Sequence, residues 1–267
     1  MTTVLCVPQW QGSASDRALR LMAGARRAAG LVPADAVVTV PVVEAGGDKA
    51  AGVRAYDVLV ENQRLTREAL AGIDDRVITV GGDCAVDLAP IAAARVRYGE
   101  ALTVLWIDAH PDVYSPRTLP SGAFHGMVVR ALLGDGPAGL ALEQPLTPQQ
   151  VIIAGERAGD PSEHDYLART GLRRYGVDDL ERALDGLRGP VYVHLDLDVL
   201  EPAAFAATCY PEPGGVRPRR LADLVSQVDD IVGAAITEYA PSGDALDPGE
   251  AETIRLLGAA LTGQVRT

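Results

Sequence analysis

The chain has 267 residues, 48% of them hydrophobic, and a formal net charge of −12 at neutral pH. A chain of this length can bury a large core, and its negative charge argues against nucleic acid or an anionic membrane as a partner. No apolar run approaches the ~20 residues of a membrane span, and the amino terminus lacks a signal-peptide pattern. Three widely spaced cysteines suit a reducing compartment better than a disulfide framework, so we expect a cytoplasmic protein.

Short apolar runs alternate with longer helical patterns along the chain. The predicted strands cover residues 3–7, 36–42, 76–80, 102–107, 151–154, 172–175, 191–197 and 234–238. The predicted helices cover residues 15–29, 55–71, 85–98, 125–133, 162–170, 178–187, 218–230 and 250–261. This alternation is typical of an α/β protein with a mostly parallel sheet that is covered on both faces. No linker or repeat divides the chain, so we expect one domain over residues 1–267.

Two of the predicted strands lead into segments rich in aspartate. Asp108, His110 and Asp112 alternate after one strand, and Asp196 and Asp198 share that spacing after another. Alternate residues of an extended segment point to the same side, and the carboxyl ends of parallel strands are where ligands bind. Carboxylates crowded at this edge repel one another unless a cation lies among them. The pattern therefore predicts a metal site, with two ions of a hard or borderline type such as Mn²⁺.

Two other interpretations compete for these aspartates. Each aspartate could cap a helix or turn after its strand, as aspartates often do. The segment 196–198 also resembles the nucleophile motif of haloacid-dehalogenase-like phosphatases. However, Val199 and Leu200 do not fit the residues that follow that motif, and the phosphatase interpretation leaves the first aspartate segment unexplained. A metal site accounts for both segments together.

Three further segments complete a recognisable pattern: 81–84 (Gly-Gly-Asp-Cys), 121–126 (Ser-Gly-Ala-Phe-His-Gly) and 238–241 (Glu-Tyr-Ala-Pro). With the two aspartate segments, they resemble in order and spacing the ureohydrolase family, which includes arginases, agmatinases, guanidinobutyrases and formiminoglutamases. The resemblance implies a three-layer α/β/α, arginase-like fold with an eight-stranded sheet, which agrees with the strands counted above. Because the family commonly forms trimers or hexamers, the resemblance also implies a homo-oligomer.

The resemblance assigns roles to the acidic segments. The two-manganese site of the family maps onto six residues: Cys84, Asp108, His110, Asp112, Asp196 and Asp198. Asp108 and Asp196 resemble the carboxylates that bridge both ions. His110 and Asp198 would complete the shell of one ion, and Asp112 would bind the other.

Two more residues are implied to act on the substrate. His125 resembles the acid/base histidine of the family, and Glu238 resembles the carboxylate that holds a guanidinium or amidine group. The implied reaction is hydrolysis of a C–N bond by a hydroxide between the two ions, to give urea or a related amide and an amine. Two cations that share one water lower its pKa strongly, and Asp112 could orient the resulting hydroxide. His125 could deliver a proton to the departing amine.

Cys84 departs from the family pattern, because most members have histidine at this position. A thiol is a poor ligand for Mn²⁺ until it is deprotonated, and a thiolate prefers softer metals. Three outcomes stay open: Cys84 binds as a thiolate, the ion beside it is held weakly, or that ion is absent. Cys84 could also be a small buried side chain without a metal role.

The predicted substrate loop differs from that of true arginases. Tyr114 and Ala123 replace two asparagines that help to hold the amino-acid carboxylate, whereas Ser121 persists. In the segment 155–161, Asp160 keeps a family carboxylate and Ala158 loses another. These changes argue against plain L-arginine and favour an agmatine-like compound, a guanidino acid or a hydroxyguanidine.

Two alternative functions remain. A catalytically impaired binding or regulatory subunit of the same fold is supported by the change at Cys84 and opposed by the other intact site residues. A metal-dependent amidase that releases formamide instead of urea is the other alternative.

Overall fold

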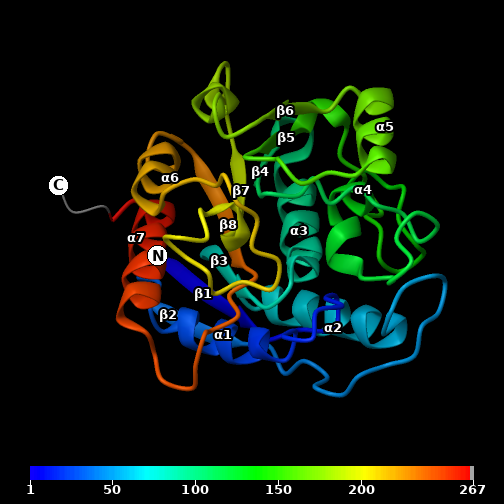
Figure 1. Cartoon of the computed structure of the whole chain (residues 1–267), viewed down its shortest axis with the longest axis horizontal. Helices are drawn as coiled ribbons and strands as arrows, with labels where there is room; N and C mark the ends of the chain where they lie inside the picture. The colour runs from blue at the N-terminus through cyan, green and yellow to red at the C-terminus, as the bar shows by residue number, and fades with distance from the viewer. Residues whose placement is uncertain (265–267) are drawn as a thin grey trace.

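An eight-stranded sheet runs through the centre of the protein (Figure 1), whose computed structural model describes residues 1–264. The strands are β1 (Thr2–Val7), β2 (Ala36–Thr39), β3 (Arg76–Gly81), β4 (Thr103–Ile107), β5 (Val151–Ala154), β6 (Arg173–Tyr175), β7 (Val191–Asp196) and β8 (Ile231–Thr237). Their order is β2-β1-β3-β8-β7-β4-β5-β6, and every pair of neighbours runs parallel. All eight predicted strands are therefore present, in a sheet that is wholly and not just mostly parallel.

Helices cover both faces of this sheet. They are α1 (Arg20–Ala29), α2 (Tyr56–Leu70), α3 (Leu88–Tyr98), α4 (Val128–Leu132), α5 (Pro161–Thr170), α6 (Pro218–Val225) and α7 (Pro248–Thr262). Side chains of α1, α6 and α7 pack with one face, and those of α2, α3, α4 and α5 pack with the other. These layers confirm the predicted α/β/α architecture. Within the described residues, no helix has both the length and the hydropathy that crossing a membrane requires.

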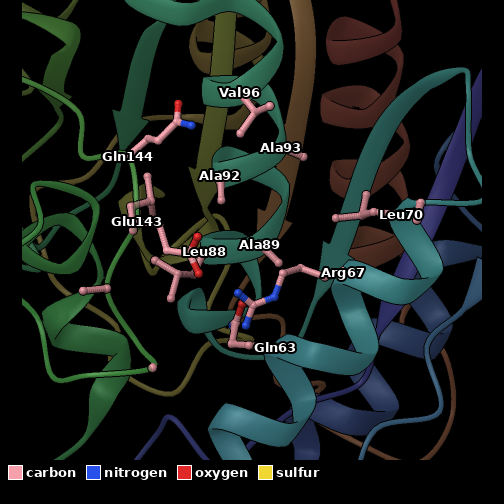
Figure 2. A pocket seen from close by; sticks show the side chains of 14 residues that line it. Gln63, Arg67, Leu70, Leu88, Ala89, Ala92, Ala93, Val96, Glu143 and Gln144 are labelled. Atoms are coloured by element: carbon pink, nitrogen blue, oxygen red, sulfur yellow. The ribbon is translucent and has the colours of Figure 1, made fainter.

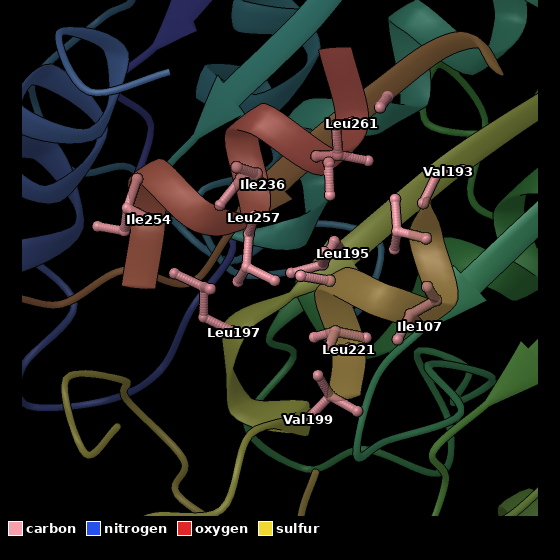
Figure 3. Packing of buried hydrophobic residues seen from close by; sticks show 14 of the residues in the cluster. Ile107, Val193, Leu195, Leu197, Val199, Leu221, Ile236, Ile254, Leu257 and Leu261 are labelled. Atoms are coloured by element: carbon pink, nitrogen blue, oxygen red, sulfur yellow. The ribbon is translucent and has the colours of Figure 1, made fainter. Parts of the chain in front are cut away.

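The core follows from the alternation of side chains along the strands. On β4, Leu105 and Ile107 belong to one buried cluster, whereas Trp106 belongs to another on the opposite face. Figure 3 shows the first cluster, where strand residues meet Leu221 of α6 and Leu257 of α7. Full burial of such an aliphatic side chain stabilises a fold by about 1.5–3 kcal/mol. Both faces of the central strands are apolar, so both need a covering layer.

Five predicted helices differ in extent or kind. Those predicted for residues 85–98 and 125–133 each begin as a 3-10 helix, Cys84–Asp87 and Phe124–Met127, before α3 and α4. Residues 178–187 form only a 3-10 helix, Leu180–Leu184, and Gly186 follows it in a left-handed conformation with a φ of 73°, which turns the chain. The first predicted helix begins only at Arg20, after a series of turns. Helix α6 ends at Val225, before two aspartates whose charge would oppose the negative end of a longer helix.

Candidate metal centre and pocket

Four neighbouring strands in the middle of the sheet end at one edge. These strands are β3, β8, β7 and β4, side by side in this order. At or just beyond their carboxyl ends lie, respectively, Cys84, Glu238, Asp196 and Asp108. Ligands bind at this edge of parallel sheets, near the point where the strand order changes direction. The fold thus brings together the segments that the sequence singled out.

The register between β4 and β7 sets the positions of two aspartates. Trp106 is paired with His194 in this register. Asp108 and Asp196 lie two residues further along each strand, so they project on the same face of the sheet. The rings of Trp106 and His194 stack on that face with centroids 3.4 Å apart, and the Trp106 indole N–H donates to Asp108 Oδ2 at 3.0 Å.

Asp108, Asp112, Asp196 and Asp198 form a buried acidic cluster at this edge. On one side of it, His110 lies between two carboxylates. Its Nδ1 is 3.1 Å from Asp198 Oδ2 and 3.5 Å from Asp108 Oδ1. The His110 backbone N–H donates to Asp108 Oδ1 at 2.7 Å. Similarly, the Asp198 N–H donates to Asp196 Oδ1 at 2.8 Å. Turn capping, the alternative role for these aspartates, therefore accounts for one oxygen of Asp108 and one of Asp196.

On the other side of the cluster, the Cys84 thiol donates to Asp196 Oδ2 at 2.8 Å. Its Sγ lies 3.6 Å from Thr237 Oγ1 and 3.8 Å from Glu238 Oε1. Atoms able to bind a metal lie within 4.8 Å of one another in two groups: Cys84, Asp108, His194 and Asp196, and Asp108, His110 and Asp198. These groups contain all the predicted metal-ligating residues except Asp112. They also contain His194, which the sequence reasoning missed.

Asp112 and Glu238 each keep one carboxylate oxygen without a partner. Asp112 Oδ2 and Glu238 Oε2 are buried and form no hydrogen bond within the described part of the chain. Both residues adopt left-handed backbone conformations, with φ values of 52° and 62°. Residues other than glycine adopt this conformation at an energetic cost. Strain of this kind is concentrated at functional sites. Buried unpaired oxygens of this kind indicate a missing cation or hydrogen-bond donor.

The carboxylates of this cluster are only 1–4% exposed, and their burial is unfavourable without balancing charge. Burial, followed by nearby carboxylates, raises the pKa of Asp112 and Asp196 well above the ordinary value, and burial raises that of Asp198 to about 6. Burial also acts to raise the pKa of Asp108, but the hydrogen bonds and charge of His110 outweigh it and lower that pKa. Within residues 1–264, no arginine or lysine forms an ion pair with these carboxylates. Protons or bound cations must therefore supply the balance.

The thiol and one imidazole also have shifted pKa values. Burial, followed by the charges of Asp196 and Glu238, raises the pKa of Cys84 well above its ordinary value. Burial acts to lower the pKa of His125, but the charge and hydrogen bond of Glu238 outweigh it, so that this pKa is raised. His125 Nδ1 lies 3.1 Å from Glu238 Oε1. His125 is therefore placed to keep its proton to a higher pH than an imidazole in water would.

A pocket of about 220 Å³ opens onto the cluster. It is lined by Cys84, His110, Asp112, Tyr114, Leu119, Ser121, Ala123, His125, Gly126, Asp196, Asp198 and Tyr210. Tyr114 and Ser121, which the sequence predicts to bind substrate, are thus at the pocket, and Glu238 lies against His125. Asp160, predicted for the same role, is not among the lining residues. Its carboxylate accepts from the Ser162 hydroxyl and the Glu163 N–H, and so caps helix α5.

Tyr210 is a pocket residue that the sequence reasoning missed. Its ring centroid lies 5.2 Å from that of His125 and 6.5 Å from that of His110. The residue lies in a loop rich in proline and glycine, where no side-chain periodicity indicates which residue points inward. Only the path of the loop places Tyr210 over the two histidines.

The loop after β1 fixes the position of the Gly-Gly-Asp segment. A Cβ at Gly82 would lie 1.5 Å from the carbonyl oxygen of Gln9, so only glycine allows this approach. Asp83 accepts from the Gly12 N–H at 2.9 Å and from Gln9 Nε2 at 3.1 Å. The Gly12 carbonyl in turn accepts from the His125 backbone N–H at 3.1 Å. One loop therefore positions residues on two sides of the pocket.

A second and larger cavity, of about 450 Å³, lies between α2 and α3 (Figure 2). Alanine and leucine side chains form much of its lining, and its polar lining residues are Gln63, Arg67, Glu143 and Gln144. No residue of the acidic cluster lines it. The candidate site is therefore identified by its convergent titratable groups and not by its volume.

Comparisons with known proteins agree with this geometry. The sequence profile of the arginase family matches residues 17–264. The chain is 28% identical over 249 residues to an arginase of Staphylococcus aureus (strain MSSA476), covering 83% of this chain and 80% of that protein. It is also 28% identical over 245 residues to N(omega)-hydroxy-L-arginine amidinohydrolase of Streptomyces lavendulae, covering 88% of each. The crystal structure of arginase from Bacillus subtilis subsp. subtilis str. 168 has the same fold, with a TM-score of 0.82 at 22% identity over 100% of this chain and 99% of that one.

Proposed function

The chain belongs to the arginase family, and on that premise we propose that it is a metal-dependent hydrolase of a small guanidino or amidino compound. The bond that breaks is a C–N bond, and the products are urea, or a related amide, and an amine. The convergence of buried carboxylates with imidazole and thiol groups at one sheet edge carries this proposal. The names of the relatives, arginase and N(omega)-hydroxy-L-arginine amidinohydrolase, support the reaction class.

We propose that two divalent cations, in the first instance Mn²⁺, bind in the cluster. The residues that would hold them are Cys84, Asp108, His110, Asp112, Asp196 and Asp198. Their oxygen-rich donor set suits a hard or borderline ion, and the unpartnered Oδ2 of buried Asp112 fits a cation as its missing partner. Bound cations would supply Lewis acidity, which lowers the pKa of water toward neutrality.

The pocket lining favours a cationic substrate without a carboxylate at its far end. It contains the carboxylates of Asp112, Asp196 and Asp198 but no arginine or lysine. A guanidinium group would therefore be attracted, whereas an amino-acid carboxylate beside Tyr114 and Ser121 would find their hydroxyl groups but no arginine or lysine to pair with. This supports an agmatine-like compound or a hydroxyguanidine without an α-carboxylate over plain L-arginine. A guanidino acid would fit only if its carboxylate reached solvent.

Three side chains would carry out the proton transfers and the positioning. Asp112 would accept a hydrogen bond from the attacking water and orient it. In the proposed step, the water oxygen bonds to the guanidinium carbon and the C–N bond breaks, while both protons of the water pass to the leaving nitrogen, one of them by way of His125, so that urea and an ammonium product form. Glu238, whose Oε2 has no partner, would hold the cationic group and also the protonated His125 ring. Such positioning lowers the entropic part of the barrier.

The test is a panel of guanidino and amidino compounds, assayed for urea and amine release. The protein is stripped with a chelator, dialysed, and assayed before and after addition of Mn²⁺. We expect no turnover by the stripped protein, recovery with Mn²⁺, and a preference for compounds without an α-carboxylate. Hydrolysis that is unchanged after complete metal removal would contradict the proposal.

A second candidate is a binding or regulatory subunit that does not turn over substrate. The contact between the Cys84 thiol and Asp196 favours it, because a proton is held where one cation is expected. Mn²⁺ binding without hydrolysis of any compound in the panel would support this role. Release of formamide instead of urea would assign an amidase. The proposed homo-oligomer, a trimer or hexamer, is tested by light scattering on the purified chain.

A further inference from the structure

His194 is a buried histidine that the proposed reaction does not use. It lies on β7 in the interior of an apolar strand, two residues before Asp196, and is 0% exposed. One of its ring nitrogens belongs to the group of potential metal-binding atoms that Cys84, Asp108 and Asp196 also supply, all within 4.8 Å of one another. The histidine therefore lies beside the same cation position as Cys84.

The orientation of the His194 ring is fixed on two sides. Its Nδ1 lies 2.8 Å from Asp87 Oδ2, and Asp87 also accepts a hydrogen bond from the Tyr192 hydroxyl. The Trp106 ring stacks against the imidazole at 3.4 Å with an angle of 4° between the planes. Because a carboxylate accepts hydrogen bonds, Nδ1 carries the proton and Nε2 keeps its electron pair. The tautomer is thus set by a residue outside the cluster.

The free nitrogen of His194 faces the Cys84 side. Its Nε2 lies 3.4 Å from Thr237 Oγ1, a long contact, and the same hydroxyl lies 3.6 Å from Cys84 Sγ. Metal-binding histidines commonly donate their other N–H to a carboxylate, which fixes the ring and makes the ligand more basic. Asp87 and His194 have this arrangement, on residues that are both fully buried.

We propose that His194 is a metal ligand, which binds through Nε2 the cation beside Cys84 and is oriented by Asp87. This inference rests on the proposed metal-dependent function. It gives each of the two cations one imidazole, His110 on one side and His194 on the other. The ligand sets then differ, because the Cys84 side adds a sulfur and a nitrogen to the carboxylates. Such a set favours borderline ions such as Zn²⁺ or Co²⁺ over Mn²⁺ more strongly than the His110 side does.

The competing role is that of a satisfied core histidine, with Asp87 and Thr237 as its two partners. A core histidine would not respond to metal, and its replacement would change stability without changing metal affinity. The two roles therefore separate in any measurement that reports on the ring nitrogens themselves.

The direct test uses nuclear magnetic resonance of the full chain, with ¹⁵N-labelled histidine, as diamagnetic Zn²⁺ is added to the metal-free protein. The chain has four histidines, and exposed His164 is an internal control because it lies outside both metal-binding groups. We expect the Nε2 resonance of His194 to shift on Zn²⁺ binding while its Nδ1 stays protonated, and His164 to stay unchanged. A His194 Nε2 resonance that stays in place at saturating Zn²⁺ overturns the inference, whether or not His110 responds.

Variants give an independent readout. We expect His194→Gln to abolish the tighter of the two Zn²⁺ binding steps in calorimetric titration, and Asp87→Asn to weaken that step by about 10–100-fold. His164→Gln should change neither step. In His194→Gln, the carboxylate of Asp87 could be left as an unpaired buried charge that destabilises the fold. The double variant H194Q/D87N removes that carboxylate together with the histidine and is the control for this effect.

Unchanged Zn²⁺ affinities in a folded His194→Gln protein overturn the inference. The proposed hydrolysis would still stand in that case, because it depends on metal binding to the other ligands. Conversely, a His194 resonance that responds to Zn²⁺ in a protein that hydrolyses nothing would contradict only the proposed function.

Discussion

The floor of the pocket and its mouth are built in different ways. The floor consists of side chains at the ends of four paired strands, and these side chains are almost completely buried. The mouth consists of loop residues such as Tyr114, Ser121 and Tyr210, which are partly exposed. Strand register fixes which residues lie at the floor, because a shift of one residue would turn each side chain to the other face of the sheet. Loops, in contrast, tolerate changes of sequence and length. Changes in the floor should therefore alter the chemistry, and changes at the mouth should alter which compound is bound.

The largest effect should come from removing a carboxylate that belongs to both metal-binding groups. Asp108→Asn leaves the shape of the side chain but removes the charge that both groups share. Because metal assistance is worth several kcal/mol, we expect the turnover number to fall at least about 10³-fold. Metal content, measured by elemental analysis, should fall with it. Full activity with a full complement of metal would mean that Asp108 is not a ligand.

A pocket residue that moves protons should behave differently from a floor residue that holds metal. His125→Asn should lower kcat by about 10²–10⁴-fold and leave the metal content unchanged. His164→Asn, on the exposed start of α5, is the matched control and should leave both quantities unchanged. Loss of metal in His125→Asn would place His125 in the metal site instead.

Part of the candidate site could be predicted from the sequence alone. The alternation of Asp108, His110 and Asp112 after an apolar run was enough to predict the floor, because strand period and the carboxyl edge follow from pattern alone. The eight strands were predictable for the same reason. A histidine inside an apolar strand, such as His194, looks like core, and its partner Asp87 lies 107 residues away in the chain. Only the folded sheet brings the two together.

Loops and local caps are harder to predict. Asp160 was predicted to bind substrate, and in the structure its carboxylate also caps α5, so its substrate role stays a prediction. The segment 178–187 has a helical pattern but contains Gly186 in a left-handed conformation, so only Leu180–Leu184 form a 3-10 helix. Tyr210 carries no periodic signal, because the position of a loop is set by contacts distant in sequence.

The raised pKa values of the floor predict how metal removal acts on stability. Burial raises the pKa of Asp198 from 3.8 to about 6, so between about pH 4 and pH 6 the folded metal-free protein holds a proton that the unfolded chain has released. The free energy of unfolding of the metal-free protein therefore falls as the pH rises through this window. Bound cations replace such protons.

We therefore expect the melting temperature of the chelated protein to fall by several degrees between about pH 4 and about pH 7. The metal-loaded protein should change less, so the difference between the two widens with pH. Differential scanning calorimetry on both forms measures this difference. A gap that is constant with pH would mean that the carboxylates are not protonated in the metal-free protein.

The smallest effect should come from the mouth. Tyr114→Phe removes one hydroxyl from the pocket lining and leaves the ring, so it should raise KM by about 2–10-fold, the equivalent of one hydrogen bond. The turnover number and the metal content should stay as they are. Steady-state kinetics with the best compound of the panel gives the comparison. A fall in kcat without a change in KM would assign Tyr114 to the floor instead.

The left-handed backbone at Asp112 and Glu238 has a consequence for how this protein can change over time. Each left-handed conformation costs an L-residue roughly 1–2 kcal/mol, and each of the two residues also has a buried oxygen without a partner among the described residues. Stability and reactivity are therefore in conflict at these two positions. Descendants of this chain that no longer needed to react should drift first to glycine or asparagine there, which would make the fold more robust as its chemistry was lost.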